Sequence, residues 1–316
     1  ISKKVNPYLI DEQHGFRGGR STETNLMTFT NYVSHSLDKG YQVDCSYNDF
    51  SKAFDKVNHD ILLRKLGKFG FSYALLKLFS SYFQNRVQYV SHGLFQSQQF
   101  RTLSGVPQGS VLGPLFFSLF INDISKSISH AKFLLFADDL KLFLEITSLR
   151  DCCLLQADVN SIFEWGRRNK LDFNTTKCSV LTYTRSTSVV YLRYTMGYAS
   201  LTRLSSVKDL GVWFESKLSF RSHIEVICGK ALKMLGFIIR IGRTFTSDHV
   251  LELLYSTLVR SRLEYGSLVW APHDAKYVLM IERVQKKFLR FLYMRTYGYY
   301  PWLYPLCVCA RYAWLQ

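Results

Sequence analysis

Two adjacent carboxylates, Asp138 and Asp139, lie between two apolar runs of strand-forming residues, 133–136 and 140–144. Like charges about 4 Å apart repel by roughly 4 kcal/mol at an effective dielectric constant of 20. A divalent cation would relieve that repulsion, and Mg²⁺ prefers carboxylate oxygens as ligands. A solvated turn explains the pair equally well, because Asp is common in turns. The pair by itself therefore predicts a metal site and a solvated turn about equally.

A second acidic element, residues 49–55, carries one carboxylate at each end. Asp49 ends a predicted strand at 41–50, and Asp55 follows after a turn. A strand-end carboxylate that meets the first pair could hold two Mg²⁺ ions about 3.5–4 Å apart, which aligns an attacking hydroxyl with a phosphate. We therefore predict that Asp49 is a metal ligand and that Asp55 is a helix N-cap.

A loop rich in glycine and proline, residues 104–114, precedes an apolar stretch that is predicted to be helical. Three glycines and two prolines in eleven residues fix a specific loop conformation. Its exposed backbone N–H groups could meet a phosphate or a base pair, with Gln108 as the side chain that faces a nucleotide. A purely structural turn is the alternative.

The elements that must position these groups follow from hydrophobic periodicity. Helices are predicted at 21–37, 58–69, 73–83, 109–124 and 149–171, strands at 41–50, 178–183 and 210–214, two strands across 132–144, and a hairpin across 87–103. Beyond Ser219, successive helices are predicted at 221–241, 247–262 and 276–295. The fold class is therefore α+β, with a mixed domain at 1–215 and a basic helical region at 216–316. The final 20 residues receive no assignment.

The composition favours a polyanionic partner. The formal charge is +16, the pI is near 9.5, and aromatic residues make up 16% of the chain. Neutralised phosphates release counterions, so such a chain suits nucleic acid. Uninterrupted apolar stretches of about 18 residues are missing, which argues against a membrane span. Seven scattered cysteines, including the close pairs Cys152–Cys153 and Cys307/Cys309, lack zinc-site spacing and favour a reducing compartment, the nucleus or cytoplasm.

Six blocks of this sequence, 13–22, 49–55, 104–117, 136–139, 171–177 and 210–220, are followed by the stretches 254–272 and 281–291. In their residues and in their order, these blocks resemble the reverse transcriptases of long interspersed, non-LTR retrotransposons, and their sequences are similar to those of the jockey-like group of arthropods. The two later stretches resemble the segment that follows the polymerase motifs in those elements. The resemblance covers nearly the whole chain except the final 20 residues.

The resemblance implies a right-hand polymerase with fingers, a palm built on an antiparallel sheet, and a helical thumb. It implies RNA-directed DNA synthesis from dNTPs on an RNA template, with a DNA primer or nicked target DNA, for retrotransposition. Asp49, Asp138 and Asp139 are then the catalytic carboxylates, and Asp49 and Asp138 are the principal ligands of two Mg²⁺ ions, for which Mn²⁺ is a possible substitute. The backbone of Phe50 also reaches the metal.

The nucleotide pocket is implied in the same way. Phe54 matches the aromatic position that excludes a ribose 2′-hydroxyl, although core packing would also explain it. Gln108 and the backbone of Gly109 face the nucleotide. Lys177 matches a lysine proposed to protonate pyrophosphate, and a solvated surface lysine is an equal alternative.

The remaining candidate residues contact nucleic acid or triphosphate. Arg17 and Arg20 clamp phosphates, or form surface ion pairs instead. The primer grip is assigned to the hairpin Leu210, Gly211, Val212 and Trp213, where Trp213 could also fill core. Basic thumb side chains that track the duplex backbone, or form an ordinary solvated face, are Lys230, Lys233, Arg240 and Arg243.

The chain is expected to be a fragment, because the block usually found upstream of the fingers motif and the endonuclease domain of such elements are missing from it. An inactive relic that only binds nucleic acid is therefore the alternative to a working polymerase. An RNA-dependent RNA polymerase shares the paired aspartates, but Phe54 opposes that reading.

Overall fold

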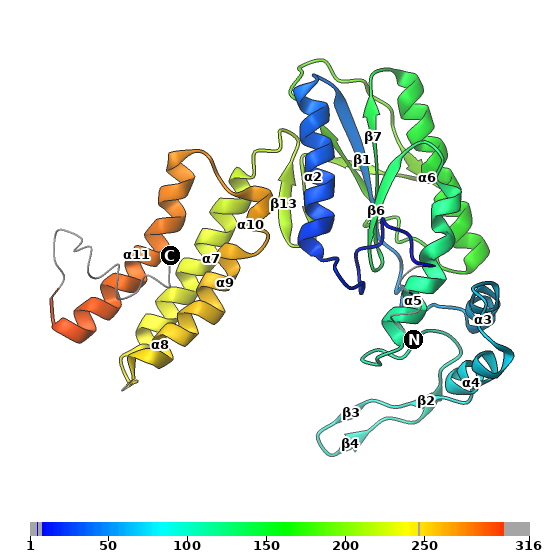
Figure 1. The fold of residues 1–316 in the computed structure, drawn as a ribbon, viewed down its shortest axis with the longest axis horizontal. Helices are drawn as coiled ribbons and strands as arrows, with labels where there is room; N and C mark the ends of the chain where they lie inside the picture. The colour runs from blue at the N-terminus through cyan, green and yellow to red at the C-terminus, as the bar shows by residue number, and fades with distance from the viewer. Residues whose placement is uncertain (1–4, 6–7, 246, 300–316) are drawn as a thin grey trace. The chain divides into compact units, whose positions relative to one another are not determined.

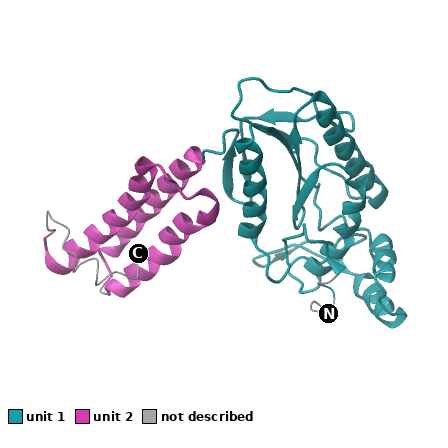
Figure 2. Cartoon of the chain, turned by 45° about the horizontal axis from the view of Figure 1, so that its top comes forward, with its two compact units in different colours: residues 1–219 teal, residues 220–316 magenta. Residues whose placement is uncertain are grey.

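The computed structural model describes residue 5 and residues 8–245 and 247–299, and it divides the chain into two compact units, residues 1–219 and 220–316 (Figures 1 and 2). The unassigned residues 300–316, with Cys307 and Cys309, lie outside the described part. Within the described ranges, no helix combines the length and apolar character that crossing a membrane requires.

Unit 1 is built on a five-stranded sheet with β1 at its centre. In spatial order the strands are β11 (Thr202–Leu204), β8 (Ser179–Tyr183), β1 (Gln42–Asn48), β7 (Asp139–Ile146) and β6 (Lys132–Phe136). The pairs β1–β7, β1–β8 and β6–β7 are antiparallel, whereas β11 runs parallel to β8. The predicted strands at 41–50, 132–144 and 178–183 are confirmed.

Two helices pack on this sheet. The first, α2 (Thr22–Asp38), contacts β1 and β6, and the second, α6 (Leu149–Asn169), contacts β7 (Figure 1). Phe29 of α2 is fully buried against the rings of Tyr47, Phe143 and Tyr183, which fixes one face of the sheet. Because side chains alternate along a strand, the odd-numbered residues of β7 share that face.

The remaining helices of unit 1 come from residues 59–127. They are α3 (His59–Lys68), α4 (Tyr73–Phe83), α5 (Gly113–Ile121) and the 3₁₀ helix η2 (Asn122–Ser127). The side chain of Asn58 caps α3, so the predicted N-cap role of Asp55 is wrong. The helix predicted from residue 109 begins only at Gly113. An earlier start would place Pro114 inside the helix, where it breaks a backbone hydrogen bond.

Short strands complete unit 1. The predicted hairpin across 87–103 is confirmed as two successive ladders, β2 (Val87–Gln88) with β5 (Phe100–Arg101), and β3 (Ser91–His92) with β4 (Phe95–Gln96). The sequence patterns missed β9 (Thr195–Met196), β10 (Ala199–Ser200), β11 and β12 (Ser206–Asp209). The strand predicted at 210–214 begins at Val212 instead, in β13 (Val212–Glu215). Leu210 and Gly211 both have positive φ and form the tight turn between β12 and β13.

The described residues of unit 2 form helices. These are α7 (Arg221–Gly242), α8 (Asp248–Tyr255), the π-helical turn η3 (Ser256–Arg260), α9 (Ser261–Glu264), α10 (Ser267–Trp270) and α11 (Ala275–Tyr297). The stacked rings of Tyr255 and Phe288, 4.1 Å apart, join α8 to α11. The predicted helices at 221–241 and 276–295 are confirmed, whereas the one at 247–262 is divided among three elements.

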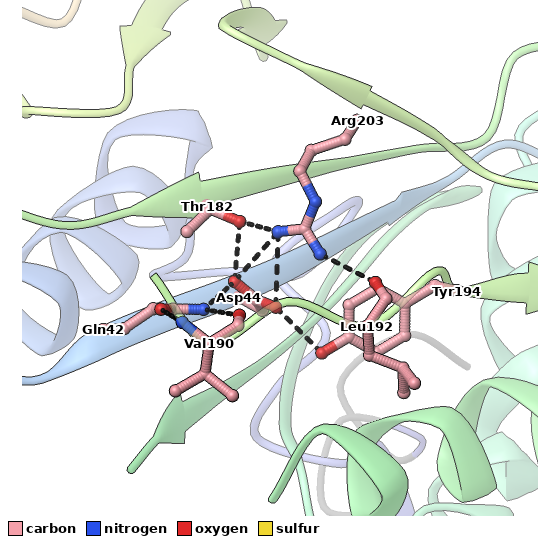
Figure 3. A network of polar contacts seen from close by, with 7 residues as sticks. All are labelled: Gln42, Asp44, Thr182, Val190, Leu192, Tyr194 and Arg203. Carbon is pink, nitrogen blue, oxygen red and sulfur yellow. Dashed lines mark hydrogen bonds and ion pairs between the residues drawn. The ribbon is translucent and has the colours of Figure 1, made fainter. Parts of the chain in front are cut away.

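A buried carboxylate in unit 1 ties the segment after β8 to the central strand (Figure 3). Asp44 is fully buried in β1, and it accepts hydrogen bonds from Thr182 (2.7 Å), Tyr194 (2.8 Å) and Gln42 (3.0 Å). The Arg203 guanidinium, on β11, lies 3.3 Å from the same carboxylate and also donates to the Leu192 carbonyl. Side-chain hydrogen bonds thus attach this segment to the sheet, whereas backbone hydrogen bonds attach the strands to one another.

We predict that Asp44→Ala destabilises unit 1 by about 3–5 kcal/mol, because it leaves the Arg203 charge and three hydrogen-bonding groups without their buried partner. The measurement is chemical denaturation of the whole chain. The matched control is Asp38→Ala, which breaks an exposed ion pair with Arg185 and should cost less than about 1 kcal/mol. Equal losses in the two variants would contradict the role given to the network.

Candidate active site

The turn between β6 and β7 carries the paired aspartates and is held from outside by one side chain. Ala137 adopts a left-handed conformation (φ 56°), which is uncommon for a residue other than glycine. The buried Gln13 amide contacts both polar groups of Ala137: its Oε1 accepts from the Ala137 N–H (3.0 Å), and its Nε2 donates to the Ala137 carbonyl (3.3 Å). This double hydrogen bond stabilises the strained turn.

The same N-terminal segment adds further contacts to β6. The backbone N–H of His14 donates to the Leu135 carbonyl at 2.9 Å, and the Asn25 side-chain amide donates to the same carbonyl at 3.0 Å. A Cβ placed on Gly15 would lie 2.3 Å from the Ala137 nitrogen, so only glycine permits this approach. Residues 13–25 therefore position the aspartate turn.

Asp49 follows the last residue of β1 and faces Lys177. The Lys177 Nζ lies 3.4 Å from the Asp49 Oδ2 atom, and that oxygen is buried without a hydrogen-bond partner among the described residues. The backbone of Asp49 accepts from the Asn174 N–H at 2.8 Å, which brings the turn that carries Lys177 to the end of β1. Phe50 is buried and stacks on Phe173, with the ring centroids 4.2 Å apart.

Burial and neighbouring carboxylates disfavour the charged forms of Asp138 and Asp139. Burial, followed by the neighbouring Asp49, raises the pKa of Asp138. Burial, followed by the charges of Asp138, Asp209 and Asp49, raises the pKa of Asp139 to about 6. The site therefore holds negative charge that its own cations do not offset.

These donors suit a divalent cation in kind. Two buried oxygens lack hydrogen-bond partners in the described part of the chain: Oδ2 of Asp49 and Oδ1 of Asn25. Both residues line the same cleft as Asp139. The described residues contain no group of three or more His, Cys, Asp or Glu side chains arranged to hold a metal ion. In this conformation Asp49 contacts Lys177 instead.

A cleft of about 230 Å³ brings several predicted residues together. Asp49, Asp139, Lys177 and Leu210 line it, whereas Asp138 does not. The other lining residues are Asn25, Tyr47, Asn48, Phe136, Leu140, Lys141, Ser179, Val207, Lys208 and Asp209. The cleft thus joins the ends of β1 and β7 to the β12–β13 hairpin, and we name it the active-site cleft.

A buried ion pair fixes the hairpin beside the aspartates. Lys141 and Asp209 form this pair, and their side chains are only 5% and 7% exposed. Lys141 lies two residues after Asp139 on the same face of β7, and its ammonium also lies 4.8 Å from the centre of the Phe29 ring. The pair positions Leu210 at the cleft. Val212 is buried behind it, Gly211 is exposed, and Trp213 is half-buried.

Phe54 lies where the turn after β1 meets the glycine–proline loop. Its ring stacks on Phe117 at 4.4 Å and meets the exposed Phe16 edge-on at 6.2 Å. The Phe54 carbonyl accepts from the Val106 N–H at 2.8 Å. The packing reading and the gate reading of Phe54 both agree with this position.

The glycine–proline loop is docked onto the turn that contains Asp55. Gln108 donates to the Asp55 carboxylate at 2.9 Å, and both side chains are exposed. Gly105 has φ 90° and approaches Asp55 so closely that a Cβ would lie 2.7 Å from its carbonyl oxygen. Gly109 has φ 76° and is exposed. Asp55 therefore anchors the loop.

Arg17 and Arg20 share one ion-pair partner. The Nη2 atom of Arg17 lies 3.2 Å from Asp11, and that of Arg20 lies 3.5 Å from the same oxygen. Arg17 also donates to the Ile10 carbonyl at 2.7 Å. The ion-pair alternative is thus what this conformation shows. Burial, followed by the charges of Arg20, Lys141 and Arg17, lowers the pKa of the neighbouring His14 to about 4.

The predicted thumb cations belong to unit 2. Lys230, Lys233 and Arg240 are exposed along one stripe of α7, spaced by three and seven residues, and Phe237 lies between them. Arg243 is exposed and follows the last residue of α7 as its C-cap.

Comparison with known proteins decides the family. The family model described as reverse transcriptase (RNA-dependent DNA polymerase) matches residues 1–237. The chain belongs to this family.

The reverse transcriptases of mobile elements are among its relatives. The jockey polymerase of Drosophila funebris is 26% identical over 93% of this chain, and the probable polymerase of transposon BS from Drosophila melanogaster is 27% identical over 83%. The predicted resemblance to jockey-like polymerases is confirmed. The chain spans about a third of the length of these relatives, 34% and 30% respectively.

Solved structures of telomerase also align with this reverse transcriptase. The truncated apo telomerase from Candida tropicalis is 12% identical, covers 68% of this chain and 42% of its own, and gives a TM-score of 0.48. Telomerase from Candida albicans is 11% identical, covers 95% of this chain and 52% of its own, and gives a TM-score of 0.44.

Sequence reasoning missed three residues that position the site. Gln13 lies 124 residues from the turn that it holds, and Lys141 lies 68 residues from Asp209. Their local sequence does not identify the partners of these contacts. A lysine two residues after the aspartates, on the same strand face, was the available hint that a buried cation lies near them.

The raised pKa of Asp139 gives a prediction about stability. Its folded pKa, about 6, lies above the unfolded value of about 3.9, so the ionised carboxylate destabilises the folded chain above pH 6. Asp139→Asn should therefore stabilise the chain at pH 7.5. We expect a gain on the order of 1 kcal/mol, because the Asp139 carboxylate is surrounded by protein on one side but still open to solvent, which screens its charge. The gain should shrink as the pH falls through 6 and vanish near pH 4.

The control for this measurement has the opposite sign. Hydrogen bonds from Thr147 and Ser148 lower the pKa of Asp151, so Asp151→Asn should destabilise the chain at neutral pH, with the difference lost in acid. Denaturation curves from about pH 2 to pH 7.5 check both variants, because the Asp151 contribution is lost only below about pH 4. A pH-independent effect of Asp139→Asn would contradict the assignment.

Proposed function

We propose that this chain is the polymerase part of a reverse transcriptase that adds dNTPs to a primer 3′-hydroxyl on an RNA template, in the service of a mobile element. The supporting observation is that Asp49, Asp139 and Lys177 line one cleft beside the Asp138 turn. Membership of the reverse transcriptase family supports a nucleotide substrate for that cleft.

The carboxylates are the proposed metal ligands. Asp49, Asp138 and Asp139, with the backbone of Phe50, would hold two Mg²⁺ ions, or Mn²⁺ in their place. When bound, such ions activate the attacking hydroxyl and neutralise the leaving pyrophosphate. Burial, followed by neighbouring carboxylates, raises the pKa values of Asp138 and Asp139, and this supports the role because bound cations would favour the ionised carboxylates.

Lys177 has two proposed tasks. Its ammonium neutralises part of the charge of Asp49 when the site is without nucleotide, since the two groups lie 3.4 Å apart. In the reaction the same ammonium donates a proton to the leaving pyrophosphate. Its exposed position, on a turn held by Asn174, leaves it free to change partner.

The nucleotide would lie between the aspartate turn and the glycine–proline loop. Phe54 excludes the ribose 2′-hydroxyl, while Gln108 and the Gly109 backbone contact the incoming nucleotide. Arg17 and Arg20 bind its phosphates. Gln108 must then exchange its hydrogen bond with Asp55 for one to substrate.

The two units take the roles of a right hand. Unit 1 is the proposed fingers and palm, and the β12–β13 hairpin with Leu210, Gly211, Val212 and Trp213 is the primer grip. Unit 2 is the proposed thumb, whose α7 stripe of Lys230, Lys233 and Arg240, with Arg243, follows the phosphates of the template–primer duplex.

The first test is loss of a carboxylate. Asp138→Ala should abolish Mg²⁺-dependent dNTP incorporation on a primed RNA template and leave template binding largely unchanged, because Asp138 carries the chemistry and not the affinity. Primer extension and fluorescence anisotropy measure the two quantities. The control Asp172→Asn removes an exposed carboxylate on the segment that carries Lys177. Equal dNTP incorporation by Asp138→Ala and the parent chain would contradict the two-metal assignment.

The second test concerns sugar selection. Phe54→Ala should lower the ratio of kcat/KM for a dNTP over the matching rNTP by at least about tenfold, because the ring no longer excludes the 2′-hydroxyl. Using a ratio cancels any loss of folded protein from the broken stack with Phe117. Phe16→Ala is the control, since that exposed ring meets Phe54 only edge-on. An unchanged ratio would show that the gate lies elsewhere.

A further inference from the structure

A second cleft in unit 1, of about 690 Å³, is lined by cations that the proposed polymerase reaction does not use. It lies among α3, η2 and the C-terminal end of α6. Its lining residues are Ile61, Arg64, Lys65, Lys68, Phe69, Leu119, Asp123, Lys126, Ser127, Trp165, Arg168 and Asn169. It shares no lining residue with the active-site cleft. We name it the basic cleft.

The floor of the basic cleft is an internally paired charge. The Lys65 ammonium is buried, lies 2.6 Å from the Asp123 carboxylate and donates to the Phe120 carbonyl at 2.6 Å. The Trp165 indole N–H also donates to Asp123, at 3.0 Å. Among the described residues, Asp123 is the only acidic one that lines the cleft, and Lys65 offsets its charge.

Four further cations surround this neutral floor. Arg64, Lys68, Lys126 and Arg168 are exposed, and none forms an ion pair within the described residues. On α6 the nearest carboxylate, Glu164, pairs with Arg167 and offers Arg168 only its backbone carbonyl. The rim therefore carries four uncompensated positive charges.

Such an arrangement attracts a multivalent anion. Cations around a concave surface with low-dielectric walls focus a positive potential, and their mutual repulsion falls when an anion binds. Two of the four are arginines, whose planar guanidinium groups match phosphate oxygens in pairs. Four cations around one cleft suit an anion with several charges, such as successive phosphates of one strand, better than a single carboxylate or chloride.

We propose that the basic cleft binds the phosphodiester backbone of a nucleic-acid strand, as a holding site apart from the active-site cleft. Buried aromatic rings lie between the two clefts: Trp165, which lines the basic cleft, is 6.3 Å from the Phe50 ring, and Phe50 follows Asp49 in the chain. Packed side chains therefore separate the phosphates bound in the basic cleft from the catalytic carboxylates. This site adds to the proposed polymerase activity and does not depend on it.

The test compares two matched triple variants of the whole chain. The cleft variant is Arg64→Gln, Lys68→Gln and Lys126→Gln. The control variant is Lys39→Gln, Lys77→Gln and Arg150→Gln, which removes the same charges from exposed positions that line neither cleft. All six side chains are exposed, so both variants should fold, and their thermal midpoints verify this.

The readout is anisotropy of a labelled single-stranded RNA and a labelled DNA duplex between 50 and 300 mM KCl. In the cleft variant we expect weaker binding of at least one of them, and a log–log salt slope that is shallower by about 2, for three lost contacts of roughly 0.7–0.9 each. Loss for RNA alone identifies the strand as RNA, and loss for the duplex alone identifies it as DNA. Primer extension at saturating template should stay at the parental rate.

Three results would overturn the proposal. Parental affinity and slope for both ligands would show that the cleft binds neither. An equal loss in the control variant would show that net charge alone, and not this cleft, sets the affinity. Binding of a polyglutamate peptide that is lost only in the cleft variant, with nucleic-acid binding intact, would assign the cleft to an acidic protein. Asp138→Ala should keep the cleft-dependent binding, so failure of the polymerase assignment is separable from failure of this one.

Discussion

The site depends on two hydrogen bonds between the Gln13 amide and the backbone of Ala137. A left-handed alanine between two strands costs free energy that a glycine would not, so the turn persists only where its surroundings stabilise it. Gln13 satisfies both polar groups of that residue in a place where water does not reach them. Without this contact, Asp138 and Asp139 would still follow β6, but their carboxylates would lose their fixed direction.

The Lys141–Asp209 pair extends the same principle to the other side of the cleft. A buried ion pair adds little net stability, because both groups lose their hydration, but leaving one of them alone is costly. It therefore specifies an arrangement: the β12–β13 hairpin can lie only where Asp209 meets β7. Gln13 and this pair connect an N-terminal segment, a central strand and a late hairpin around one group of carboxylates. These polar contacts fix where the segments of the site lie.

Much of this could be anticipated from the sequence, and the rest could not for identifiable reasons. Strand periodicity and the paired aspartates located β6, β7 and their turn, since those signals are local. The role of Asp55 was misjudged because Asn58, three residues later, satisfies the helix start better and leaves Asp55 to hold the loop at Gln108. The strands between 195 and 209 are too short for periodicity to show. Contacts such as Gln13 with Ala137 join residues more than a hundred positions apart, and one sequence contains no record of them.

The Asp44 network has a consequence for how this protein can change over generations. Polar contacts join residues 184–201 to the sheet in two ways. The Tyr194 side chain bonds to Asp44, and the backbone carbonyls of Val190 and Leu192 accept from Gln42 and from Arg203, which follows the segment. A backbone carbonyl can accept the same hydrogen bond whichever side chain its residue carries. The exposed positions of this segment are therefore open to neutral drift, whereas its buried residues Tyr194, Met196 and Leu201 are constrained. A segment with little regular secondary structure can thus remain fixed in its place on the fold.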